Sequence, residues 1–131
     1  MVDELARVLE EQPDIAYAVL FGSAGRGAIR PTSDVDVAVE FQAGTTRDLT
    51  RLGHLVARLE AAAGRRVDLV LMEEASAPLA YRVFREGRIL FERDHAALVR
   101  RKAQAIIQYL DWKPVEDLCA EGVLRRAARR G

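Results

Sequence analysis

The feature that most constrains the fold is an alternating segment, Asp34 to Phe41, which follows a continuous apolar run, Ile15 to Phe21, after a short connection. Both segments have the length of a strand, and the apolar run is rich in residues that favour strands. Successive side chains of a strand point to opposite faces, so Asp34 and Asp36 share one face while the valines between and after them share the other. The pattern predicts a covered central strand beside a strand with one carboxylate face and one core face.

A strand, helix and strand follow in order. We expect the helix to be capped by Thr45 or Thr46 and to end at Gly64, and the next strand to run from Arg66 to Met72. A crossover of this kind makes the two strands parallel and brings them into one sheet. Asp68, in an otherwise apolar strand, is therefore expected beside the two carboxylates of the earlier strand.

The remaining segments predict helices and one further strand. Helical spacing of apolar residues and the positions of Ser, Gly, Pro and Asp residues define their limits. We expect a helix over residues 3–11, a helix capped by Ser76 that stops at Gly87, an edge strand over 88–91, a helix that starts at Asp94 and is interrupted by Pro114, and a last helix over 115–128.

Composition excludes several classes of protein. The chain has 131 residues, which suits one domain, and its 20 basic and 20 acidic residues leave no net charge to favour nucleic acid or an anionic membrane. It has no apolar run near the roughly 18 residues that span a bilayer and no secretory leader, so we expect a cytoplasmic protein. Cys119, the single cysteine, can form neither an internal disulfide nor a zinc site.

The carboxylates and the preceding turn suit chemistry on a phosphate. Asp34 and Asp36 offer hard oxygen ligands for one or two Mg²⁺ ions, and Asp68 could hold the second ion or accept a proton from an acceptor hydroxyl. Gly22 permits close approach of the backbone, and Ser23 adds a hydroxyl donor beside amides that could face a phosphate. The combination predicts phosphoryl or nucleotidyl transfer.

These residues carry a resemblance to a known family. The order Gly22-Ser23, ten intervening residues, Asp34-x-Asp36 and a later strand aspartate, Asp68, resembles the nucleotidyltransferase signature of the DNA polymerase beta superfamily. The match GSAGRG and the small size resemble its minimal nucleotidyltransferase branch. The likeness covers roughly residues 15–94.

The resemblance implies a fold and a set of residue roles. It implies an α+β palm, a mixed sheet of about four strands flanked by helices, in a single domain 1–131 with its core at about 15–94 and C-terminal helices at about 94–128. By the same resemblance, ATP phosphates are held by the glycine-serine turn, Gly22 and Ser23, and two Mg²⁺ ions by Asp34, Asp36 and Asp68. Arg26 could pair with the β- or γ-phosphate or could be a surface arginine.

The same branch also implies a partner. Many of its members resemble antitoxins of HEPN-domain ribonuclease toxins, in which AMP is transferred from ATP to a toxin tyrosine. About forty residues follow Phe91, enough for two helices, so we expect the acceptor to come from another molecule. Two alternatives stay open: a small hydroxylated acceptor of the aminoglycoside type, and an antitoxin that acts by binding alone.

Other notable side chains are expected to be structural. His54 and His95 are predicted at the surface rather than as ligands. Tyr109 and Trp112, near the predicted helix break, could form an exposed aromatic patch for a partner or could pack in the core. The arginine-rich tail is expected to be a solvated helix face.

Overall fold

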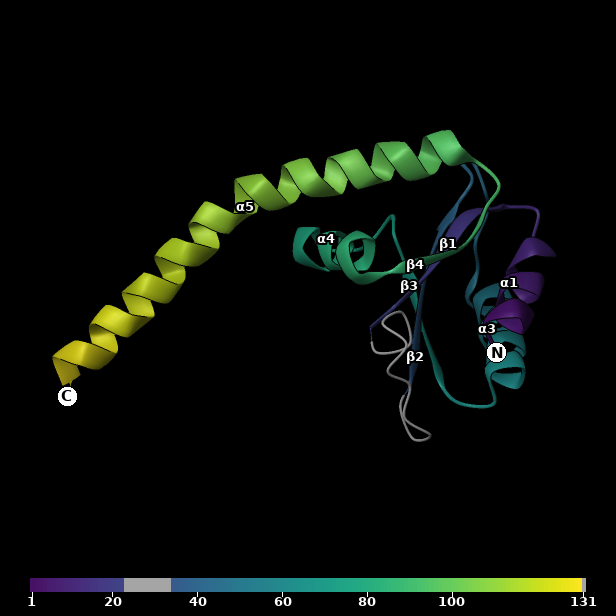
Figure 1. The fold of residues 1–131 in the computed structure, drawn as a ribbon, viewed down its shortest axis with the longest axis horizontal. Helices are drawn as coiled ribbons and strands as arrows, with labels where there is room; N and C mark the ends of the chain where they lie inside the picture. The colour runs from purple at the N-terminus through teal and green to yellow at the C-terminus, as the bar shows by residue number, and fades with distance from the viewer. Residues whose placement is uncertain (23–33, 131) are drawn as a thin grey trace.

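The structure, a computed structural model, describes residues 1–22 and 34–130, with side chains described through residue 114. Figure 1 shows the elements in chain order. They are α1 (Val2–Glu10), β1 (Ile15–Phe21), β2 (Val35–Phe41), α3 (Leu49–Ala63), β3 (Val67–Leu71), α4 (Ala77–Glu86), β4 (Arg88–Glu92) and α5 (His95–Arg130).

The strands form a mixed four-stranded sheet in the order β3-β2-β1-β4. β1 lies antiparallel to both β2 and β4, whereas β2 and β3 are parallel. The predicted crossover through α3 is therefore confirmed, as are the α+β class with its mixed sheet and the edge position of β4. β1 is central, and all seven of its residues are buried.

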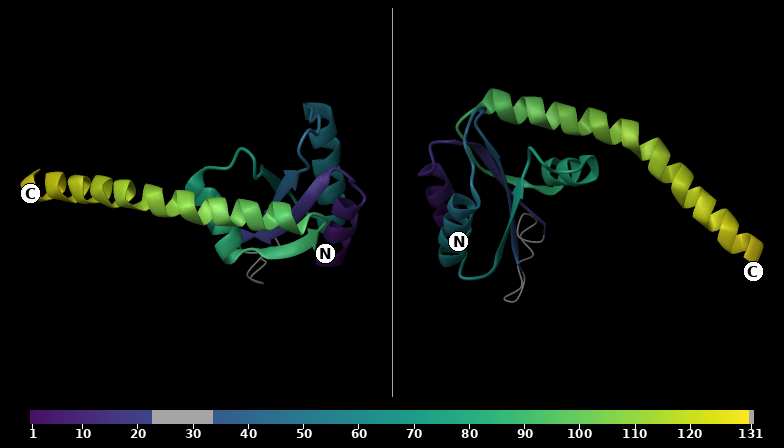
Figure 2. Two further views of the ribbon diagram at one scale, coloured as in Figure 1. Left: turned by 90° about the horizontal axis from the view of Figure 1, so that it is seen from above. Right: turned by 180° about the vertical axis from the view of Figure 1, so that it is seen from behind.

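Helices cover both faces of this sheet. α1 and α3 pack on one face through Leu5, Leu9, Leu55 and Leu59, which join the core valines of β2. α4 and α5 pack on the other, where the buried residues include Ala38 of β2, Ala80 and Val83 of α4, and Ala97, Leu98 and Ala105 of α5. Figure 2 shows the two pairs of helices on opposite sides of the strands. The face of β2 that carries Asp36 is thus partly a core face, because Ala38 belongs to the buried cluster to which α4 and α5 contribute.

The helix caps follow the sequence at Gly64, Ser76, Gly87 and Asp94 and differ at one further site. Gly64 ends α3 in the left-handed conformation, with φ 70°. The Ser76 side chain accepts a hydrogen bond from the Leu79 amide, and Asp94 accepts one from Ala97. The prediction of Thr45 or Thr46 as the cap of α3 is wrong, because Asp48 takes that place and accepts a 2.7 Å hydrogen bond from the Arg51 amide. A carboxylate caps a helix at least as well as a threonine hydroxyl.

The predicted break at Pro114 is also wrong. α5 runs without interruption from His95 to Arg130, with Pro114 inside it, so the chain ends in one long helix rather than two. A proline removes one helical hydrogen bond and clashes with a carbonyl of the preceding turn, which kinks a helix without necessarily ending it. The ribbon of α5 bends along its course and projects well beyond the sheet (Figure 1). Across the described part of the chain, none of the helices combines the length and apolarity needed to cross a membrane.

Candidate active site

The site begins where β1 ends. Phe21, its last residue, pairs with Asp36 of β2, and Gly22 follows in the left-handed region with φ 70°. A Cβ atom at Gly22 would collide with Oδ2 of Asp36. A glycine is thus required at position 22 for two reasons. Residues with an L side chain disfavour this backbone conformation, and the Asp36 carboxylate occupies the space that a side chain would need.

Asp36 and Asp68 lie side by side on parallel strands. The register pairs Asp36 of β2 with Asp68 of β3, so their side chains leave the same face of the sheet. Burial raises the pKa of the Asp36 carboxyl above its ordinary value; the negative charge of Asp68 adds to this rise and that of Asp34 contributes further. Asp36 is partly buried, whereas Asp68 and Asp34 are exposed. Burial and the two neighbouring negative charges therefore disfavour the charged form of Asp36.

The donor set suits a hard divalent cation. Two carboxylates on neighbouring strands repel each other, and a cation between them relieves the repulsion that raises the pKa of Asp36. Carboxylate oxygens are ligands that Mg²⁺ accepts with part of its water shell retained. Within residues 1–22 and 34–130, however, no group of three or more His, Cys, Asp or Glu side chains is close enough to hold a metal ion. Among the described residues, Asp36 and Asp68 are therefore the pair of carboxylates that suits a divalent cation.

The predicted site residues divide into two sets. The structure brings Gly22, Asp36 and Asp68 together, and it places Asp34 immediately before β2, where its charge still acts on Asp36. Ser23 and Arg26 lie outside the described residues, so their predicted roles are not tested.

One residue of the site was missed by sequence reasoning. Arg82 of α4 is the cation whose charge lowers the pKa of Asp36, against the effects of burial and of the two other aspartates. Its Nε donates a 3.2 Å hydrogen bond to Glu86 one turn along the helix. The i,i+4 pair of Arg82 and Glu86 can be read from the sequence, but its effect on Asp36 cannot, because it depends on the docking of α4 on the sheet.

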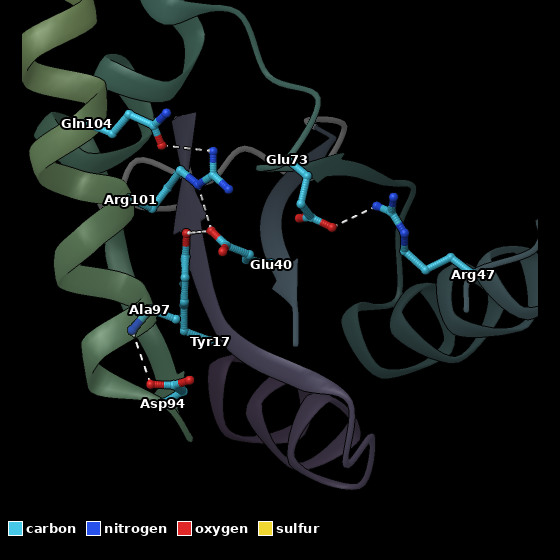
Figure 3. Close-up of polar contacts among 8 residues, drawn as sticks. All are labelled: Tyr17, Glu40, Arg47, Glu73, Asp94, Ala97, Arg101 and Gln104. Atoms are coloured by element: carbon cyan, nitrogen blue, oxygen red, sulfur yellow. Dashed lines mark hydrogen bonds and ion pairs between the residues drawn. The ribbon is translucent and has the colours of Figure 1, made fainter. Parts of the chain in front are cut away.

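A second polar cluster lies under the start of α5, on the same face of the sheet. Tyr17 donates a 2.7 Å hydrogen bond to Oε1 of Glu40, and Nε of Arg101 donates a 2.8 Å hydrogen bond to the same oxygen (Figure 3). Burial and the hydrogen bond to Glu40 raise the pKa of Tyr17 far above its ordinary value. The cluster ties β1, β2 and α5 together, which makes it an anchor for the long helix.

Comparison with known proteins gives a family and a set of neighbours. The polymerase beta nucleotidyltransferase family profile matches residues 3–96. A crystal structure of a toxin-antitoxin with AMP-PNP has a TM-score of 0.78 at 24% identity, over 94% of this chain and 98% of that one. The MNT antitoxin in complex with a tri-AMPylated HEPN toxin from Shewanella oneidensis has a TM-score of 0.73 at 22% identity, over 94% and 95%.

A third solved structure, described as a minimal nucleotidyltransferase, has a TM-score of 0.56 at 32% identity, over 66% of this chain and 86% of that one. A search of curated proteins finds no match. The antitoxin likenesses show a shared fold, while the family follows from the profile, which spans most of the chain, together with Gly22 and the paired aspartates. The chain belongs to the polymerase beta nucleotidyltransferase family.

Proposed function

We propose that this protein is a Mg²⁺-dependent adenylyltransferase that moves AMP from ATP to a tyrosine hydroxyl of a HEPN-type ribonuclease toxin, and so acts as its antitoxin in the cytoplasm. The observation that carries the proposal is the register pairing of Asp36 and Asp68 beside Gly22, in a chain of this family. Support for the acceptor comes from a neighbour whose partner toxin is tri-AMPylated, and support for ATP from one that contains AMP-PNP.

The reaction needs a nucleophile, a leaving group and a proton acceptor. The tyrosine oxygen attacks the α-phosphorus of ATP, a new O–P bond forms, the bond to the β-phosphate oxygen breaks, and pyrophosphate leaves. In the proposal Asp68, the exposed carboxylate of the pair, takes the phenolic proton. Gly22 lets the Asp36 carboxylate approach the turn that begins there, and in the proposal Ser23 and Arg26 bind phosphate oxygens.

The aspartates also have a role toward a metal. Asp36 and Asp68, which share a register position, would hold Mg²⁺, and Asp34, immediately before β2, would join them. The ion would supply positive charge for the triphosphate and the departing pyrophosphate.

The test uses labelled ATP, Mg²⁺ and a HEPN-type protein, if one is encoded beside this chain. Wild-type protein is expected to transfer label to a tyrosine of that partner, located by mass spectrometry, and Asp36→Ala is expected to abolish transfer while remaining folded. Asp3→Ala, an exposed aspartate of α1, is the matched control and should label normally. Absence of transfer by folded wild-type protein to any co-encoded partner would contradict the proposal.

Cell protection separates catalysis from binding. If the protein neutralises a toxin by transfer, an Asp34→Ala/Asp36→Ala double variant loses protection although it still binds the partner. Full protection by the double variant would instead establish neutralisation by binding alone. An AMP adduct on an aminoglycoside, with no label on protein, would identify the small-molecule alternative.

A further inference from the structure

A groove lies between α4 and α5. Its volume is about 240 Å³, and its aromatic and charged lining residues are Tyr81, Arg82, Arg85, Glu86, Tyr109 and Trp112. On α4 the groove residues recur at helical spacing, opposite the buried Ala80 and Val83 that face the sheet. The outer face of α4 therefore forms one wall, and α5 forms the other.

The groove has an aromatic platform. The rings of Tyr81 and Tyr109 stack with centroids 4.0 Å apart and an angle of 3° between their planes, and the Trp112 ring centroid lies 6.3 Å from that of Tyr109. Trp112 is still 37% exposed. Trp112 is exposed and Tyr109 is half-buried, so of the two alternatives the partly exposed aromatic patch fits better than a core role, and the patch lines the groove.

The charge of the groove is positive on balance. Arg82 and Arg85 face one carboxylate, that of Glu86, which is paired with Arg82. Arg82 also lowers the pKa of Asp36 through its positive charge, so one cation of the groove acts on the carboxylate site as well. A ligand that spans the two sites would have a flat ring at one end and negative charge toward the other.

The volume limits what the groove can hold. Drug-sized sites occupy roughly 300–1,000 Å³, so a groove of about 240 Å³ admits one ring system and not a whole nucleotide. Nucleobases stack on aromatic side chains whatever their sequence identity, because every base has a π face. A neutral aromatic side chain of an acceptor could stack on the aromatic residues, but it would bring no negative charge to Arg85.

We propose that the groove between α4 and α5 is the nucleobase subsite, in which the purine ring of ATP stacks beside Tyr109 and Trp112 while its phosphates extend past Arg82 toward Asp36. This inference deepens the proposed function and rests on it for the identity of the nucleotide. It assigns Tyr81, Tyr109 and Trp112 to donor binding, a role that no sequence motif indicates.

The natural reporter is Trp112, because it is the only tryptophan of the chain. The full-length protein is titrated separately with adenosine, ATP and inorganic triphosphate while tryptophan fluorescence is recorded. Adenosine and ATP are expected to change the emission in a saturable way, whereas triphosphate, which has no ring, leaves it unchanged. An emission change with triphosphate alone, or none with adenosine, overturns the inference.

A variant pair then tests the platform. Tyr109→Ala is expected to weaken binding of adenosine and ATP about tenfold, as expected when one stacked aromatic neighbour of a base is lost. The control is Ile107→Ala on the same helix, a side chain that is 61% exposed and does not line the groove. If Tyr109→Ala does not fold, as judged by circular dichroism, Tyr81→Ala removes the other ring of the stack and carries the same expectation. Unchanged affinity in a folded variant overturns the inference.

The outcomes also separate this inference from the proposed function. Adenosine binding at Trp112 without AMP transfer to any partner contradicts the proposed function and leaves the nucleobase subsite standing. Transfer in which Tyr109→Ala raises KM for the protein acceptor, but not for ATP, shows that the groove holds the acceptor, and this overturns the subsite.

Discussion

Asp36 and Asp68 occupy paired positions on two adjacent parallel strands, so the register of the sheet itself holds two carboxylates side by side. The arrangement is unfavourable for the free protein, since burial and the neighbouring charge both raise the pKa of Asp36. Sites that hold such groups commonly serve a function at the expense of stability. This relationship leads to the first prediction.

Removing one charge of the pair is expected to stabilise the protein and to inactivate it. Asp68→Asn keeps the shape of the side chain and ends the repulsion, so in metal-free buffer the free energy of unfolding should rise by about 0.5–1 kcal/mol, at the lower end of what stabilising substitutions reach. AMP transfer should fall by a factor on the order of a hundred or more, as when a group that stabilises developing charge is removed. Urea denaturation and the labelling assay measure the two effects.

The control is Asp111→Asn, an exposed change in α5, which should alter neither stability nor transfer. A destabilised Asp68→Asn would contradict the inference that Asp36 and Asp68 repel each other.

Gly22→Ala is expected to disturb the site beyond its backbone strain. Gly22 and Gly64 share φ 70°, but only at Gly22 would the new Cβ meet another group, the Asp36 carboxylate. Gly64→Ala should therefore show the strain alone, about 1–2 kcal/mol for a left-handed residue. Gly22→Ala should show at least that loss and, in addition, should lose activity because Asp36 is displaced.

Thermal denaturation of the two variants, together with the transfer assay, measures the difference. Equal stability losses and equal activities in Gly22→Ala and Gly64→Ala would show that the close approach of Asp36 has no consequence.

Tyr17→Phe is expected to weaken the attachment of α5 to the sheet and so to lower the free energy of unfolding. The buried Glu40 would lose the hydrogen bond from Tyr17 and keep that from Arg101, and a hydrogen bond to a charged group contributes about 1.5–3 kcal/mol. We expect a loss of about 2 kcal/mol in the free energy of unfolding, measured by urea denaturation. Tyr81→Phe makes the same chemical change at a hydroxyl for which no hydrogen bond is found among the described residues, so it should cost far less.

The titration of Glu73 is expected to make the stability of the protein depend on pH. Burial raises the pKa of its carboxyl above the ordinary 4.5, although its Oε2 pairs with Arg47 at 2.7 Å. The folded protein then keeps this proton to a higher pH than the unfolded chain does. The contribution of Glu73 to stability is fully present below the ordinary pKa and declines as the pH rises toward the folded pKa.

Glu73→Gln cannot titrate and should lack this decline. The free energy of unfolding of wild type minus that of the variant should fall with rising pH, from about 4.5 upward, and then level off. Chemical denaturation at a series of pH values measures the difference. A flat difference, or one that rises with pH, would show that burial does not dominate at Glu73.

Local sequence patterns were reliable where neighbouring residues decide the structure. The two central strands, the left-handed Gly64, and the caps Ser76 and Asp94 are set by interactions within a few residues. Errors arose where two local solutions compete. Asp48 replaced the predicted threonine cap, and α5 continues through Pro114, because a kink within a long helix is an alternative to its end.

By itself, the sequence determined that Asp36 lies on a strand with Asp34 close before it, and that Gly22 precedes them at the spacing of a nucleotidyltransferase signature, because strand alternation and motif spacing are local properties. Only the tertiary structure decided that Asp68 pairs with Asp36, that Arg82 lies near enough to act on Asp36, and that Tyr109 stacks on Tyr81. Strand register and helix docking depend on contacts between residues far apart in the chain. Their outcome follows from how the whole core packs rather than from any one segment.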